Sequence, residues 1–419
     1  MNQNDQPDPG FSDDGVPWEQ LAAELDALKA ADADWAAGRV PLYVFKGSED
    51  AFRAGRDAFF KFFNENALGA GRAFPSLKTL ESDVVAMGLA LLQAPAGATG
   101  HMTSGGSESI IVAVHAAREQ ARARGARSGA NLVLAESAHP AFSKAAALMS
   151  LTERRVPVGP DFRADVGAMS AAVDDDTVMI VGSAPCFPYG VIDPIDALGD
   201  LAQRRGLWLH VDACIGGYLA PFVRDIGYPI PPFDFAVPGV RSLSADLHKF
   251  GFCPKPASTV FYRSADLAAF GVFDLDVWPS GPYRTSTLVG TRPGGAVAGA
   301  WATMRTLGRN GYRRIAGELM TMRDAYLHDL DARAGYRPLG RPDLTVMAFR
   351  RDDVDPFRVG EGLAARGWVP GLVRRPPALH LMMSMLHAPS RERYVDDLIA
   401  ATREARETPG VAATLRASY

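Results

Sequence analysis

The sequence predicts an α/β fold, with a large domain built on a mostly parallel sheet and a smaller α+β domain after it. Strand-like and helical segments alternate from about residue 100 to 262, which is the pattern of parallel strands joined by helices. A long helical run follows, from Gly294 to about Arg333. Strand-like segments at 344–350 and 379–383 and a last helix at 390–407 predict the small domain.

Composition and pattern divide the chain into four parts. The predicted parts are a disordered tail at 1–16, an N-terminal helical segment at 17–95, a large domain at 96–293, and a connecting helix with the small domain at 294–419. The N-terminal segment has helical patterns at about 18–36, 49–64 and 77–93. The Pro- and Gly-containing stretch 275–293 predicts a loop that links the two domains.

Successive strands of the predicted sheet end near residues that can bind a ligand or take part in a reaction. In chain order they lead to the glycine-rich run 103–109, then to His139, Asp212 and Lys249. A further strand, 178–183, ends in a Pro-rich loop. Ligands of α/β proteins bind outside the carboxyl ends of the strands, so we expect these residues to meet at one site.

Lys249 and Asp212 are the pair that pyridoxal 5′-phosphate (PLP) requires. A lysine bonds to its aldehyde, and a carboxylate keeps its pyridine nitrogen protonated. The glycines at 105 and 106 begin a helix, whose free N–H groups bind a phosphate dianion. Taken singly, each feature has a plain alternative: a surface lysine, a strand-end carboxylate, an ordinary helix cap or a loop histidine. The ordered series favours the cofactor.

Composition excludes several other classes of protein. The 419 residues carry a net charge of −4 without a basic block, so nucleic acid is not an expected partner. The three cysteines, Cys186, Cys214 and Cys253, argue against a disulfide framework and favour the reducing cytoplasm. No apolar run approaches the length of about 18 residues that a membrane helix needs, and the start of the chain lacks a signal-peptide pattern. We expect a cytoplasmic protein without a metal site.

Several of these runs together resemble sphingosine-1-phosphate lyase, a PLP-dependent carbon–carbon lyase related to the amino-acid decarboxylases of fold type I. The resemblance extends from about residue 43 to 403 and is strongest at 245–255. The other similar runs are 103–109, 137–145, 183–194, 210–219, 242–258, 288–295 and 376–380. It implies the fold type I transferase fold, with a mostly parallel seven-stranded sheet in the large domain.

The resemblance also implies roles for individual residues. Lys249 bonds to PLP, Asp212 pairs with the pyridine nitrogen, and His139 stacks on the ring. The cofactor phosphate is held by Gly105, Gly106, Ser107 and His248 of one chain and by Gly290 and Thr291 of its neighbour. This implies a homodimer with shared active sites. Lys255, Tyr43 and Asn66 lie on the substrate side, where Lys255 contacts the substrate phosphate.

Four positions depart from the pattern of the family. Ala67 and Gly69 stand where the family tends to have proline and histidine, and both departures affect the substrate side. Tyr189 stands where relatives often have histidine, and Thr291 replaces a serine.

The function that these features predict is retro-aldol cleavage of a phosphorylated amino alcohol, such as sphingosine or sphinganine 1-phosphate, to a long-chain aldehyde and phosphoethanolamine. A lipid of this kind is taken from water, from a carrier or by transient contact with a membrane surface. The first alternative is a PLP-dependent amino-acid α-decarboxylase, which shares Lys249, Asp212, His139 and the phosphate loop. The second is a non-catalytic protein that kept the fold.

Overall fold

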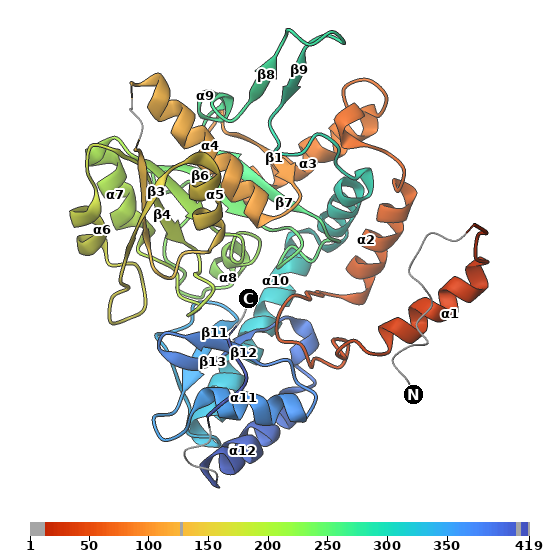
Figure 1. Ribbon diagram of the computed structural model, residues 1–419, viewed down its shortest axis with the longest axis vertical. Helices are drawn as coiled ribbons and strands as arrows, with labels where there is room; N and C mark the ends of the chain where they lie inside the picture. Colours follow the sequence, from red (N-terminus) through yellow and green to blue (C-terminus); the bar gives the residue numbers. More distant parts are fainter. Residues whose placement is uncertain (1–12, 126–128, 408–411, 418–419) are drawn as a thin grey trace.

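The computed structural model describes residues 13–125, 129–407 and 412–417, and residues 1–12 of the predicted tail lie outside this range. A seven-stranded sheet forms the centre of the large domain, in the order β1-β7-β6-β5-β4-β2-β3 (Figure 1). The neighbouring strands from β6 to β3 are all parallel, whereas β7 is antiparallel to both β6 and β1. The strands are β1 (Thr99–Thr103), β2 (Asn131–Ala135), β3 (Thr152–Val156), β4 (Thr177–Ser183), β5 (Trp208–Asp212), β6 (Val240–Ala245) and β7 (Ser258–Tyr262).

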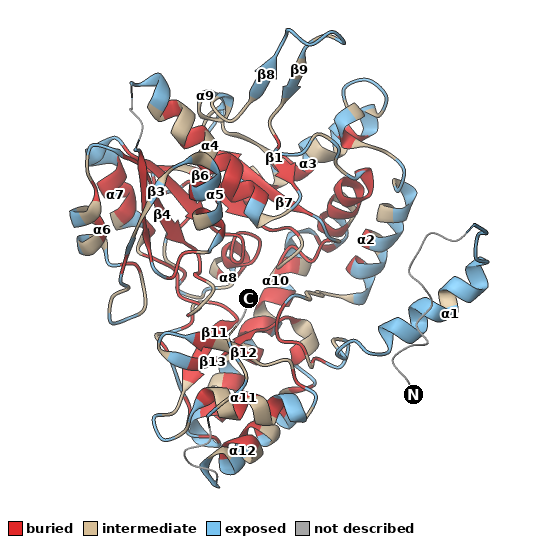
Figure 2. Ribbon diagram, viewed as in Figure 1, coloured by how far each residue is buried: buried red, intermediate tan, exposed pale blue. Residues whose placement is uncertain are grey.

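Helices cover both faces of this sheet, and β2, β4, β5 and β7 are buried along their whole length (Figure 2). Neither face of these strands meets water, so most of their side chains are apolar on both faces. Alternate residues of a strand therefore join different cores: Leu132 and Leu134 belong to the cluster that contains residues of α4 and α5, whereas Val133 belongs to the cluster that contains residues of α6, α7 and α8. The large-domain helices are α4 (Gly106–Ala123), α5 (Ala141–Met149), α6 (Val166–Ala172), α7 (Ile195–Arg205), α8 (Ala220–Asp225) and α9 (Ala265–Ala269).

The N-terminal helices differ in how they meet the rest of the chain. Helices α2 (Glu49–Lys61) and α3 (Pro75–Leu91), separated by the short η1 (Ala67–Gly69), pack against the long α10 (Gly294–Ala332). Helix α1 (Trp18–Lys29) has no buried residue and extends away from the body (Figures 1 and 2). The small domain contains a four-stranded antiparallel sheet, in the order β10-β11-β13-β12, with α11 against it and α12 packed on α11. Its elements are β10 (Arg337–Pro338), β11 (Val346–Arg350), α11 (Pro356–Ala365), β12 (Gly371–Arg374), β13 (Pro377–Met382), η2 (Met385–His387) and α12 (Arg391–Glu407).

The predicted fold class is confirmed, and two local predictions were wrong. The helical pattern at 18–36 ends at Lys29. Ala31 N and Asp32 N donate to carbonyls only three residues back, and Ala37 N donates to the Asp34 side chain in a separate turn. The predicted loop 275–293 overlaps a short hairpin of β8 (Phe273–Leu275) and β9 (Tyr283–Thr285). The predicted helical run from Gly294 to about Arg333 is confirmed as α10, with a kink at Gly308, whose φ of 52° and ψ of 179° are not helical.

Candidate active site

A cavity of about 270 Å³ opens at the carboxyl ends of β4, β5 and β6, beside the first turn of α4. This is where an α/β sheet is expected to bind its ligand. Its lining includes seven of the predicted site residues: Gly105, Gly106, Ser107, His139, Asp212, His248 and Lys249. Segments far apart in the sequence thus converge on one cavity.

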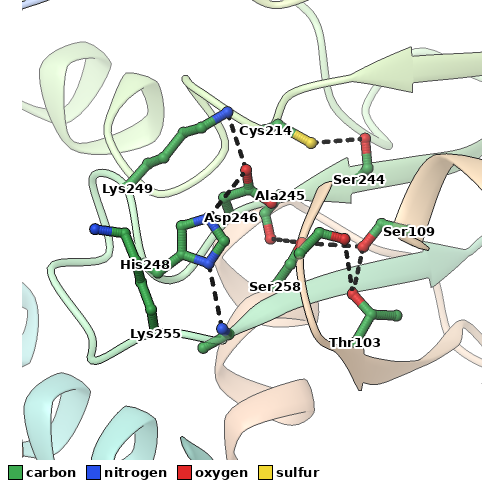
Figure 3. Close-up of polar contacts among 12 residues, drawn as sticks. Thr103, Ser109, Cys214, Ser244, Ala245, Asp246, His248, Lys249, Lys255 and Ser258 are labelled. Carbon is green, nitrogen blue, oxygen red and sulfur yellow. Dashed lines mark hydrogen bonds and ion pairs between the residues drawn. The ribbon is translucent and has the colours of Figure 1, made fainter. Parts of the chain in front are cut away.

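The start of α4 forms a backbone cradle at one end of the cavity. Gly105 precedes the helix, and no side chain caps the first N–H groups, so they are available to an anion. A Cβ atom on Gly106 would lie 2.6 Å from Cys214 Sγ and 3.0 Å from the Asp246 carboxylate oxygens, so only glycine fits there. Behind the cradle, Ser109 Oγ lies 2.6 Å from Thr103 Oγ1 and 2.9 Å from Ser258 Oγ (Figure 3). This buried hydroxyl cluster ties α4 to β1 and β7.

Glu108 is a residue of this region that sequence reasoning missed. Its side chain is 5% exposed, and Oε2 accepts hydrogen bonds from the backbone N–H and the hydroxyl of Ser104, at 2.7 and 2.6 Å. Its other oxygen accepts from Leu288 N at 2.9 Å. Glu108 therefore connects the phosphate cradle to the segment that leads into Gly290. An acidic residue in the first helical turn was a visible signal, but its distant partner was not.

Lys249 lies beside a buried carboxylate that the sequence analysis did not assign. Lys249 Nζ is 3.0 Å from Asp246 Oδ2, and His248 Nε2 is 3.6 Å from the same oxygen (Figure 3). Burial alone would raise the pKa of Asp246, but the Lys249 ammonium and His248 lower it below its ordinary value. The site therefore contains an ionised Asp246 that keeps the lysine at the edge of the cavity. His248 Nδ1 accepts from Ala257 N at 3.2 Å, which leaves Nε2 as the donor.

His139 is fixed by the helix that follows it. Its Nδ1 accepts a hydrogen bond from Ala141 N at 3.1 Å, at the start of α5. Burial lowers the pKa of His139, although Asp212 acts in the opposite direction. The ring is therefore neutral at pH 7, and it forms a wall of the cavity together with Phe187. A second cavity of about 450 Å³, between the large and small domains, shares both rings.

Loop 185–190, which contributes Phe187 to that wall, is attached to the small domain. Phe187 O accepts from His380 Nε2 at 2.8 Å, and Tyr189 Oη donates to Arg375 O at 2.6 Å. Gly190 has a φ of 72°, and a Cβ atom there would overlap Val346 O at 1.8 Å. Tyr189, one of the departures from the family pattern, is thus a contact between domains.

The remaining predicted residues lie outside the first cavity. Lys255 Nζ donates to Tyr43 O at 2.8 Å, and Lys255 lines a neighbouring aromatic cavity of about 390 Å³ that shares His248. Burial of part of its side chain lowers the pKa of Lys255.

Asn66, Gly290 and Thr291 form a separate group. Asn66 Nδ2 donates to Thr291 Oγ1 at 3.1 Å, and a Cβ atom on Gly290 would lie 2.8 Å from Tyr283 Oη. None of the three lines the first cavity of its own chain.

The geometry fits the PLP expected from the sequence. The cavity has an uncapped helix start for a phosphate, a neutral flat imidazole for a ring, a carboxylate for a ring nitrogen and a lysine for an aldehyde. All three cysteines are buried and free. Within the described ranges, no cluster of His, Cys, Asp and Glu has metal-binding geometry, and no helix is long and apolar enough to cross a membrane.

Comparison with known proteins agrees with this arrangement. Residues 63–350 match the pyridoxal-dependent decarboxylase conserved domain. A sphingosine-1-phosphate lyase of Oryza sativa is 39% identical over 93% of this chain and 74% of its own length. A probable L-tyrosine/L-aspartate decarboxylase of Methanothermobacter thermautotrophicus is 34% identical over 77% of this chain and 86% of its own.

The structure of a sphingosine-1-phosphate lyase from Burkholderia pseudomallei superposes with a TM-score of 0.92. It is 36% identical, and the match covers 96% of this chain and 94% of that one. The chain therefore belongs to the pyridoxal-dependent decarboxylase family and, within it, groups with the sphingosine-1-phosphate lyases.

Proposed function

We propose that this protein is a PLP-dependent aldehyde-lyase that cleaves a sphingosine- or sphinganine 1-phosphate-like substrate by a retro-aldol reaction. The products are a long-chain aldehyde and phosphoethanolamine. The observation that carries the proposal is the match to the Burkholderia lyase, which extends over nearly the whole of both chains at 36% identity. The alternative function, an amino-acid decarboxylase, is supported by a relative that matches 77% of this chain, whereas the plant lyase matches 93% of it.

The reaction balances without any further reagent. The bond between the amine-bearing carbon and the hydroxyl-bearing carbon breaks, and the hydroxyl proton leaves as the aldehyde forms. The electron pair of that bond remains on the amine-bearing carbon, which then takes up one proton. PLP, when bound, supplies the electron sink that stabilises the negative charge left on this carbon.

The residues of the cavity divide this task among them. Lys249 would bond to the cofactor aldehyde, and its amine would be able to take up and release a proton. Asp212 would keep the ring nitrogen protonated, and His139 would contact the ring. The uncapped start of α4, with Ser107 and His248, would hold the cofactor phosphate.

Lys255 is the residue that we assign to the phosphate of the substrate. Its ammonium is partly desolvated and held by the Tyr43 carbonyl, beside the His248 that faces the cavity. A phosphate dianion is a far better acceptor for it than a single carbonyl.

We also propose a cytoplasmic homodimer in which Gly290 and Thr291 reach the partner's cofactor phosphate. Their position outside the cavity of their own chain supports this arrangement. The three free, buried cysteines suit a reducing compartment. Because the proposed substrate is amphiphilic, the enzyme collects it by transient contact with a membrane surface.

The proposal is tested by supplying the holoenzyme separately with sphinganine 1-phosphate and with tyrosine, aspartate and glutamate. Mass spectrometry detects the aldehyde and phosphoethanolamine, and a coupled assay detects carbon dioxide. We expect stoichiometric aldehyde and phosphoethanolamine from the lipid phosphate, and neither from the Lys249→Ala variant. Carbon dioxide from an amino acid, without aldehyde from the lipid, would establish the decarboxylase instead.

A further inference from the structure

A row of polar side chains lies in the sheet directly behind Asp212. Trp208, His210 and Asp212 alternate along β5, so all three point to the same face. On β6, Ser242 pairs with His210 and Ser244 pairs with Asp212 in the strand register. All five side chains are buried, with His210 and both serines at 0% exposure. The two strands thus place a polar strip inside an otherwise apolar sheet.

Hydrogen bonds connect the whole strip. Trp208 Nε1 donates to Ser242 Oγ at 2.7 Å, and His210 Nδ1 lies 2.7 Å from the same oxygen. On its other side, His210 Nε2 lies 3.2 Å from Ser244 Oγ. Ser244 Oγ in turn donates to Asp212 Oδ1 at 3.4 Å. The strip therefore runs without a break from the indole to the carboxylate.

The count of donors decides which nitrogen of His210 carries the proton. The indole N–H can only donate, so Ser242 Oγ accepts from Trp208. If His210 Nδ1 also donated to Ser242, the Ser242 hydroxyl proton would have no acceptor among the described residues, which is costly in a dry core. Ser242 therefore donates to Nδ1, and the proton of the neutral ring is on Nε2. Burial lowers the pKa of His210 to about 4, so the ring is neutral at pH 7.

This tautomer orients the hydroxyl nearest to Asp212. His210 Nε2–H and the Cys214 thiol both donate to Ser244 Oγ, which fills its acceptor positions and directs its own proton to Asp212 Oδ1. Cys214 N also donates to Oδ1, at 3.1 Å. Both hydrogen bonds that described residues make to this carboxylate therefore go to Oδ1. The other oxygen, Oδ2, is left for the ring nitrogen of PLP.

We propose that His210 is a positioning residue that holds the Ser244 hydroxyl toward Asp212 and thereby keeps the ring nitrogen of bound PLP protonated. All the dipoles of the strip, from the Trp208 N–H to the Ser244 O–H, point toward the carboxylate. They stabilise its negative charge in a site with little water. A negative Asp212 in turn stabilises the positive charge of the protonated ring. His210 acts on the cofactor only through Ser244 and Asp212.

Packing alone does not account for the strip. His210 contacts the Phe142 ring at a centroid distance of 5.8 Å, and an apolar side chain in its place would avoid the cost of desolvating two ring nitrogens. In the observed geometry, each donor of the strip has an acceptor, and each hydrogen bond points toward Asp212. The other titratable groups around Asp212 are His139, Cys214, Asp246 and Lys249, and the substitutions below leave them all in place.

The test uses the holoenzyme with PLP labelled with ¹⁵N in the ring, and no substrate, so its outcome is independent of the proposed lyase reaction. The ¹⁵N chemical shift at a fixed pH of 7 reports how the proton is shared between the ring nitrogen and Asp212. In Ser244→Ala we expect this shift to move toward the value of the unprotonated ring, because a carboxylate without the Ser244 hydrogen bond competes better for the shared proton. One lost hydrogen bond to a charged group corresponds to about a tenfold change in this sharing. Cofactor affinity should fall as well.

Variants of His210 and Ser242 separate orientation from packing. His210→Gln keeps an amide N–H near the position of Nε2 and should retain a ¹⁵N shift close to that of the wild type, whereas His210→Phe should behave like Ser244→Ala. Ser242→Ala, which leaves Nε2–H free to donate, should have the smallest effect. A wild-type ¹⁵N shift in Ser244→Ala, or equal shifts in His210→Gln and His210→Phe, would overturn the proposal. If His210→Phe fails to fold, Ser244→Ala decides alone, because it removes a single hydroxyl.

Discussion

Replacing Gly106 by alanine tests the phosphate cradle through a contact that can be measured in the structure. The new Cβ atom would lie 2.6 Å from Cys214 Sγ and 3.0 Å from the Asp246 carboxylate. Ordinary contacts begin near 3.5 Å, so the overlap with sulfur is about 0.9 Å. Neither neighbour can move away, because Cys214 and Asp246 are 5% and 3% exposed. The first turn of α4 must shift instead.

The expected cost of this overlap is about 1–3 kcal/mol of unfolding free energy, the range for adding one methyl group to a packed core. Gly105→Ala is the matched control. Its Cβ atom would meet only His248 Cε1, at the ordinary distance of 3.5 Å, and its φ of 171° is extended backbone that any residue adopts. Thermal unfolding of the two proteins without cofactor measures the difference. Gly106→Ala should melt several degrees lower, and Gly105→Ala should melt close to wild type.

A double mutant identifies the atom responsible. Cys214→Ala removes the sulfur atom that the new methyl group of Gly106→Ala would overlap. The double mutant should therefore lose less unfolding free energy than the sum of the two single losses, by about 0.5 kcal/mol or more. Equal melting temperatures for Gly105→Ala and Gly106→Ala, or strictly additive losses in the double mutant, would refute this account of the cradle.

Four further predictions concern the chemistry and the assembly. Lys249→Ala should abolish turnover while far-ultraviolet circular dichroism remains native, and a variant with near wild-type turnover would end the cofactor assignment. Asp212→Asn should bind PLP weakly and lose most of kcat, because a neutral amide does not stabilise the protonated ring; an unchanged kcat would place another acid at the nitrogen. Lys255→Ala should lower kcat/KM for phosphorylated substrates by roughly tenfold to a hundredfold with little change in PLP affinity, whereas equal losses in both would assign it to the cofactor. Mixing Lys249→Ala with Thr291→Glu should restore activity in about half of the sites of each mixed dimer, and a mixture that stays inactive after proven subunit exchange would confine each site to one chain.

The strand ends of the large domain were predictable because their signals are local. Asp212 is the last residue of β5, and Lys249 lies just beyond the end of β6. Parallel strands bring such ends to one edge of the sheet. The glycines at the start of α4 were visible for the same reason. The family resemblance added the residues on the substrate side, whose roles remain predictions.

What the sequence did not reveal depends on pairing between distant segments. Ser244 lies opposite Asp212 only because of the register between β5 and β6, and no pattern within either strand specifies that register. Glu108 reaches Leu288 across 180 positions of the chain, so its role in fixing the cradle was equally hidden. Gly308 interrupts a run that otherwise has helical periodicity throughout, and periodicity does not report a single change of φ.

The attachment of loop 185–190 to the small domain makes one wall of the cavity sensitive to how the two domains sit. Phe187 borders the cavity, yet its carbonyl is bonded to His380 in β13, and the next residues are fixed through Tyr189 and Gly190. A rotation of the small domain would therefore carry Phe187 with it and widen or narrow the space beside His139. The position of the small domain therefore influences the shape of the site. A substitution in β13, far from any reacting atom, can change the affinity for a substrate.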